Sequence, residues 1–161
     1  VTWFLPPQDK SYTSIYEFKD QLASALGGRI AEKLLYGTDG ITTGAGSDLR
    51  KATEIARDMV IEQGMGTKLR DQVFHENNGG MLFDRMTHER PYSEDTARQI
   101  DSEVEALIKE AGRRAEAVLK HNIESLRKLA KELIDEETLD EDTVKKLLEH
   151  TEMPKEAKLY A

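Results

Sequence analysis

Apolar residues recur every three to four positions in several long stretches of the chain, and this spacing constrains the fold more than any other feature. The first stretch runs from Ser14 to Gly37, and its periodic positions are Ile15, Phe18, Leu22, Leu26, Ile30 and Leu34. Such a period places the apolar side chains on one face of a helix. Ser14 followed three residues later by Glu17 is the capping-box pattern of a helix start, and glycine is a typical helix end. We therefore predict an amphipathic helix of about six turns from Ser14 to Gly37.

Two glycines interrupt this predicted helix. Gly27 and Gly28 each cost about 1 kcal/mol relative to alanine inside a helix. Their presence predicts the close approach of another element on that side. Glu32 lies beside the same small-residue strip, so its carboxylate is either an ordinary surface acid or an acid that orients a metal-binding histidine.

A second amphipathic helix is predicted after a loop rich in glycine and threonine, with Ser47 as its N-cap and Gly64 near its end. Asp48 then lies in the first turn. It shares a face with apolar residues further along the helix, namely Ala52, Ile55 and Met59. We expect this face to turn inward. Asp48 either complements the positive end of the helix dipole, an effect of about 0.3 to 1 kcal/mol, or meets a cation such as a metal ion.

Further helices are predicted in the second half of the chain. One begins at Ser93, and a break near residues 121–122 separates it from the next. Thr138 and Glu141 have capping-box spacing and predict the start of a last helix. The tail over residues 151–161 has no apolar period, so we expect it to be frayed or disordered.

Only two short segments favour β-structure. Residues 1–5 form an apolar run ended by two prolines, which predicts one short strand. Residues 65–92 lack a sustained period, and the Asn-Asn-Gly-Gly sequence at 77–80 is typical of a small hairpin. The prediction for all 161 residues is a single all-α domain, a helical bundle with one N-terminal strand and a possible hairpin. Because the chain opens on Val1 within a strand pattern, we expect it to be a piece of a longer protein.

The composition excludes several classes of function. The chain has 31 acidic and 23 basic residues, a net charge of −8, and its basic residues are scattered among the acids. A nucleic-acid partner is therefore not expected. No cysteine is present, which excludes disulfides and thiolate metal ligands. No apolar run approaches the roughly 20 residues of a membrane span, so we expect this piece to be soluble by itself.

The common catalytic motifs are also missing. A zinc hydrolase usually carries HExxH, which places two histidines one helical turn apart. Its nearest counterparts begin at His75 and His88, but neither is followed by a second histidine four residues later. His121 and His150 have no neighbour at ligand spacing either, so we expect all four histidines to be solvated surface residues. The chain has neither the phosphate-binding GxxxxGK[ST] loop nor a GxSxG elbow.

Several longer segments nevertheless occur together in a specific order. These are LGGRIAEKLLYG, ITTGAGSDLRKATEIARDMV, the Gly-Met at 64–65, YSEDTARQIDSEVEALI and EETLDEDTV. In order and spacing they resemble FtsH, the membrane-anchored family of ATP-dependent zinc metalloproteases. The resemblance covers roughly residues 1–150 and is weakest between 66 and 90. It implies that residues 1–65 form the zinc-site half of a helical peptidase domain, that 93–150 are its C-terminal helices, and that 151–161 are a tail.

The resemblance also implies roles for two acidic residues. Asp48 matches the aspartate that is the third zinc ligand of the family, and Glu32 matches a supporting acid near the metal. The strand at residues 1–5 resembles one beside the active site, where an extended substrate pairs by strand addition. The first two ligands and the general base come from an HExxH motif that lies upstream of Val1. The chain by itself is thus expected to contain no catalytic residue and to be inactive.

For the intact protein, the resemblance implies zinc as cofactor and ATP bound only by an ATPase module outside this chain. It also implies a homohexamer, a membrane anchor with the peptidase domain on the cytoplasmic side, and unfolded or membrane proteins as substrates. Two alternatives stay open. In the first, the chain is a non-catalytic relative that serves assembly or regulation. In the second, residues 93–148 form an independent helical adaptor. Retention of TTGAGSDL favours the protease.

Overall fold

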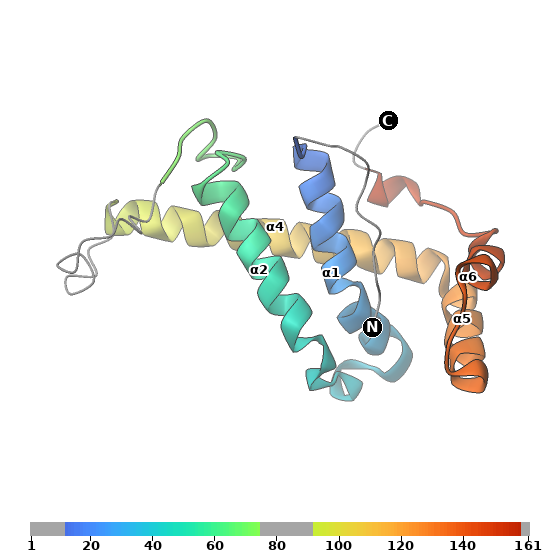
Figure 1. Cartoon of the computed structure of the whole chain (residues 1–161). Helices are drawn as coiled ribbons and strands as arrows, with labels where there is room; N and C mark the ends of the chain where they lie inside the picture. Colours follow the sequence, from blue (N-terminus) through green and yellow to red (C-terminus); the bar gives the residue numbers. More distant parts are fainter. Residues whose placement is uncertain (1–11, 75–91, 159–161) are drawn as a thin grey trace.

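The computed structural model describes residues 12–74 and 92–158, and Figure 1 shows the arrangement of their helices. The predicted strand at 1–5 and the predicted hairpin at 77–80 lie outside the described residues. Within the described ranges the regular structure is helical, apart from an isolated bridge between Met65 and Arg70. The all-α prediction is therefore confirmed.

The described part of the chain contains five α-helices and three short 3-10 turns. In chain order these are α1 (Ile15–Tyr36), η1 (Thr38–Gly40), η2 (Thr43–Ala45), α2 (Gly46–Ile61), α4 (Glu94–His121), α5 (Ile123–Glu136), α6 (Glu141–Leu148) and η3 (Lys155–Ala157). Helices α1 and α2 run in opposite directions and both cross the long helix α4, while α5 and α6 lie beyond its C-terminal end (Figure 1).

The core lies where α1, α2 and α4 meet. Its largest fully buried side chains are Leu22 from α1, Met59 and Val60 from α2, and Ile100 from α4. Small residues such as Ala56 let the helices approach closely at this crossing. Gly27 and Gly28 in α1 do not show the close approach predicted for them. No described atom lies within 4 Å of the position that a Cβ would take at either glycine, so the predicted close approach is not made by the described residues.

Two of the predicted helix starts are confirmed by their capping hydrogen bonds. The Ser14 hydroxyl accepts from the Glu17 backbone N–H, and the Glu17 carboxylate accepts from the Ser14 N–H at 2.8 Å. At α4 the Ser93 hydroxyl accepts from the N–H of Thr96 at 3.2 Å. These bonds satisfy donors that the first turn of a helix leaves without intrahelical partners.

Two other predicted caps are wrong. Helix α2 begins at Gly46 instead of after Ser47, because the turn η2 runs directly into it and Ala45 is the residue before its first turn. Helix α6 is capped by Asp140, whose carboxylate accepts from the Thr143 N–H at 2.8 Å. Thr138 therefore does not start this helix.

The two ends of α4 and the tail complete the fold. The predicted break is confirmed, since α4 ends at His121 and Asn122 separates it from α5. The prediction of a frayed tail is wrong for residues 151–158, because Pro154 and Ala157 are buried against the helices. None of the helices in the described ranges combines the length and apolarity needed to cross a bilayer.

Candidate functional site

The segment between α1 and α2 connects the helices that carry the two acidic residues singled out from the sequence, Glu32 in α1 and Asp48 in α2. Gly37 ends α1 with a φ of 78°, and its N–H donates to the Lys33 carbonyl at 3.0 Å. A left-handed conformation of this kind favours glycine. The turns η1 and η2 follow, and the Thr42 hydroxyl accepts from the Gly44 N–H at 3.2 Å. The loop is thus a defined structure that leads straight into the first turn of α2.

Glu32 anchors this loop to α1. Its carboxylate accepts two hydrogen bonds from Thr42, one from the backbone N–H at 3.0 Å and one from the hydroxyl at 2.7 Å. These bonds hold the pKa of Glu32 below its ordinary value, the hydroxyl bond having the larger effect and the charge of Arg29 a minor one. The carboxylate is therefore charged at neutral pH, and in this structure it fixes the position of Thr42.

Asp48 lies in the first turn of α2, as predicted, but it is exposed. The apolar face of α2 is buried only from Ala52 onward, so the expectation that Asp48 turns inward is wrong. The reason is the packing of α2, whose first turn lies away from the point where it crosses α4 (Figure 1). Within residues 12–74 and 92–158, the carboxylate has no hydrogen-bond or ion-pair partner. An exposed and unpaired carboxylate is accessible to an external cation.

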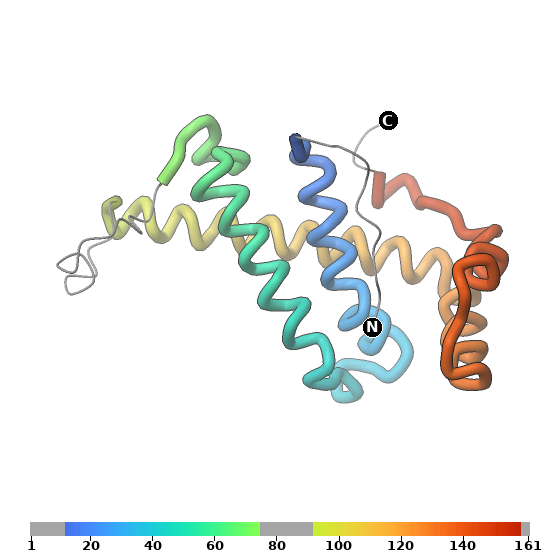
Figure 2. The backbone as a smooth tube through the Cα atoms, viewed as in Figure 1, coloured from blue at the N-terminus to red at the C-terminus, as the bar shows by residue number. Residues whose placement is uncertain are grey.

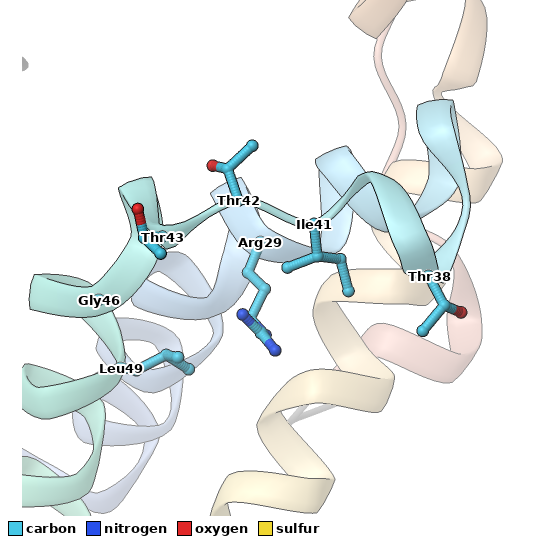
Figure 3. A pocket seen from close by; sticks show the side chains of 7 residues that line it. All are labelled: Arg29, Thr38, Ile41, Thr42, Thr43, Gly46 and Leu49. Carbon is cyan, nitrogen blue, oxygen red and sulfur yellow. The ribbon is translucent and has the colours of Figure 1, made fainter.

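A pocket of about 480 Å³ lies beside the start of α2. Figure 3 shows the Arg29 side chain between Ile41 and Leu49, with Gly46 at the beginning of α2 as part of the same wall. Three threonines complete the lining: Thr38, Thr42 and Thr43. The pocket thus combines apolar walls with hydroxyl groups and one guanidinium.

The described part of the chain does not contain a complete zinc site. A catalytic zinc takes three protein ligands and keeps one position open. Among residues 12–74 and 92–158, no three His, Cys, Asp or Glu side chains form a group that could hold a metal ion. Asp48 offers a single suitable carboxylate, while His121 lies on the surface near Glu152 and His150 is exposed. His75 and His88 lie outside the described residues.

A second anchoring carboxylate was not predicted from the sequence. Glu103 of α4 is only 8% exposed, and its two oxygens accept from the backbone N–H groups of Thr67 and Lys68. A Cβ at Gly66 would lie 2.9 Å from one of these oxygens, so a side chain at this position would displace the Glu103 carboxylate. One feature of the sequence indicates this role: Glu103 is a charged residue on the apolar face of α4, three positions after the buried Ile100.

Comparisons with known proteins confirm the resemblance drawn from the sequence motifs. The model of Peptidase family M41 matches residues 1–147. The ATP-dependent zinc metalloprotease FtsH of Caldicellulosiruptor bescii is 40% identical over 148 residues, which are 91% of this chain and 24% of the relative. FtsH 3 of Synechocystis is 38% identical over 152 residues, 92% of this chain and 25% of the relative. FtsH of Bacillus subtilis is 38% identical over 152 residues, 93% of this chain and 24% of the relative. The chain spans about a quarter of the length of these relatives. It therefore belongs to peptidase family M41, the family of the FtsH zinc metalloproteases.

Proposed function

We propose that this chain is part of an ATP-dependent zinc metalloendopeptidase and that Asp48 is its third zinc ligand. The observation that carries the proposal is the unpaired carboxylate of Asp48 on the first turn of a helix, beside a loop that Glu32 holds in place. The family membership supports zinc as the metal. A helix start with an acidic residue also has the simpler role of complementing the helix dipole. The simpler role does not require the loop before the helix to be anchored.

The residues around Asp48 serve binding and positioning. Asp48 contributes one oxygen ligand, and Glu32 keeps the loop before α2 in register through Thr42. Beyond α1 itself, no described atom lies within 4 Å of a Cβ built at Gly27 or Gly28, which leaves room for a side chain or a further element at these positions. When bound, zinc polarises the peptide carbonyl and lowers the pKa of its water toward about 7.

The remaining ligands and the general base are proposed to come from an HExxH motif outside this chain, as the family resemblance implies. One carboxylate does not hold zinc in a three-ligand site. The isolated chain is therefore proposed to be inactive. In the intact protein, ATP is bound by a separate module, a membrane anchor leaves the peptidase domain on the cytoplasmic side, and the substrates are unfolded or membrane proteins.

A homohexamer is the proposed assembly of the intact protein. Exposed apolar side chains on α5 and α6 support a contact with another chain, among them Leu133, Ile134 and Leu148. The alternative of an independent adaptor over residues 93–148 is disfavoured, because α4 buries its apolar face against α1 and α2. A non-catalytic relative that serves assembly would keep the α5 and α6 surface but would not need a free carboxylate at Asp48.

The test is Asp48→Asn in the full-length protein, with zinc content measured by elemental analysis and peptidase activity on an unfolded protein. Asparagine preserves the size of the side chain and removes its charge. We expect zinc retention to fall at least tenfold and peptidase activity to disappear. Asp39→Asn is the matched control, because Asp39 is an exposed acid in the same loop and should change neither quantity. Full zinc and full activity in Asp48→Asn would contradict the proposal.

A further inference from the structure

Residues 151–158, here called the C-terminal strap, run back from α6 onto the helices of the core. Figure 2 shows this segment leaving the end of α6 and returning toward α1 and α4. Its last turn, η3, contacts α4, and Ala157 within it is 0% exposed. Pro154 is also buried, while Lys155 and Glu156 between them are exposed. Because buried and exposed residues alternate in this way, one side of the strap packs against the helices.

The first contact point of the strap is Asn122, the residue between α4 and α5. Its side-chain amide donates to the Glu152 carbonyl at 2.9 Å, and its side-chain oxygen accepts from the Glu152 N–H at 2.9 Å. The same amide donates to the Val118 carbonyl at 2.8 Å. One side chain therefore joins the last turn of α4 to the backbone of the strap.

The second contact point is Arg114 of α4, whose side chain is 11% exposed. Its guanidinium donates to the Ala157 carbonyl at 2.9 Å and to the Lys19 carbonyl at 3.2 Å, and it pairs with the Asp20 carboxylate at 2.7 Å. A planar guanidinium with several fixed donors suits such a junction, which a lysine could not reproduce. Strap, α1 and α4 are thus joined at one largely desolvated group.

The hairpin formed by α5 and α6 depends on these contacts for its placement. No residue of either helix is buried, and the two helices pack mainly on each other. Among residues 12–74 and 92–158, the hairpin is joined to the core at its beginning, through Asn122, and at its end, through the strap. Elements with little buried apolar surface have low local stability and move readily about a hinge.

We propose that the C-terminal strap is a latch that fixes the orientation of the α5–α6 hairpin relative to the α1–α2–α4 core. Arg114 and Asn122 hold it by hydrogen bonds, and His121 lies 3.7 Å from the Glu152 carboxylate beside the Asn122 contact. With the strap docked, the hairpin is held at both ends. With the strap released, the hairpin turns about Asn122 and presents its apolar side chains over a range of directions.

The distance between the core and the hairpin tests this role directly. Because the chain has no cysteine, spin labels can be attached at Lys51→Cys in α2 and Lys131→Cys in α5, two exposed positions. In the 161-residue chain we expect one narrow distance distribution. Arg114→Gln should broaden it and should increase hydrogen exchange at the Glu152 and Ala157 amides at least tenfold. Arg113→Gln, an exposed neighbour with the same charge change, should leave both unchanged.

A second variant separates the latch from the stability of the core. A six-residue Gly-Ser insertion after His150 leaves both contact points intact but lengthens the connection between α6 and the strap, so that the docked strap no longer restrains the hairpin. We expect the distance distribution to broaden while the Ala157 amide stays protected. The proposal is overturned if the insertion leaves the distribution narrow, if Arg114→Gln frees the strap without moving the hairpin, or if Arg114→Gln leaves the strap protected. Should Arg114→Gln unfold the core, as reported by far-ultraviolet circular dichroism, the insertion decides.

Discussion

Replacing Glu103 by glutamine tests whether a buried carboxylate holds the loop after α2. In the native chain one oxygen accepts from the Lys68 N–H at 2.6 Å and the other from the Thr67 N–H. Glutamine retains one oxygen acceptor, but its NH₂ group then faces the second backbone N–H. The variant therefore keeps one hydrogen bond in a weaker, uncharged form and replaces the other with two opposed donors.

The size of the effect follows from these two changes. Hydrogen bonds to charged groups contribute about 1.5 to 3 kcal/mol and neutral ones about 0.5 to 1.5 kcal/mol, so the retained bond loses about 1 kcal/mol. A buried donor without an acceptor costs about 1 to 3 kcal/mol, and the lower half of that range applies because Thr67 and Lys68 are reached by water. Together the free energy of unfolding should fall by about 2 to 3 kcal/mol. For a chain of this size, that corresponds to a melting temperature lower by roughly 4 to 12 °C.

Thermal unfolding at pH 7, followed by circular dichroism at 222 nm, measures this change. Glu105→Gln is the matched control, because Glu105 is an exposed residue of the same helix and is paired with Lys109. The control removes the same charge and should change the free energy of unfolding by less than about 1 kcal/mol. A melting temperature for Glu103→Gln within about 1 °C of the native value would refute the assignment of Glu103 as an anchor.

Two further predictions concern the loop before α2 and the core. Because the pKa of Glu32 is held below its ordinary value of 4.5, its bonds to Thr42 stabilise the fold fully above that value and are lost as the pH falls through the lower folded-state pKa. The difference in melting temperature between the native chain and Glu32→Gln should therefore be full above pH 4.5 and shrink as the pH falls further below it, and a difference that does not change with pH would contradict the anchor. Met59→Ala removes a fully buried side chain and should lower the free energy of unfolding by about 2 to 5 kcal/mol in urea titrations. The exposed Met153→Ala should change it by less than about 0.5 kcal/mol, and similar losses in both would contradict the assignment of Met59 to the core.

The main helices could be predicted from the sequence because their determinants are local. The period of apolar residues and the side chains of Ser14 and Ser93 are sufficient to place the starts of α1 and α4. The start of α2 could not be placed locally, because η2 runs directly into it and no described side chain caps its first turn. The start of α6 could not be placed locally because more than one candidate polar residue precedes it. At α6 the carboxylate of Asp140 accepts from the Thr143 N–H, and Thr138 lies two residues too early to do so.

The docked strap could not be predicted, because its contacts join residues far apart in the sequence. Asn122 binds a backbone group 30 residues away, and Arg114 binds one 43 residues away. Nothing in the polar sequence of residues 151–158 distinguishes a docked segment from a disordered one. Only the folded helices place the two donors within reach of the strap.

The exposure of Asp48 shows what a helical period leaves undetermined. The period fixes which residues share a face, but burial depends on where along the helix a neighbour crosses it. Ala52 and Met59 are covered, whereas Asp48 on the same face projects beyond the covered part. For a proposed ligand this is the more useful position, because an inward carboxylate without a partner would destabilise the fold before any metal bound. The exposed carboxylate at the start of α2, after a loop anchored by Glu32, avoids this cost and leaves the proposed ligand position open to a metal bound mainly by another segment.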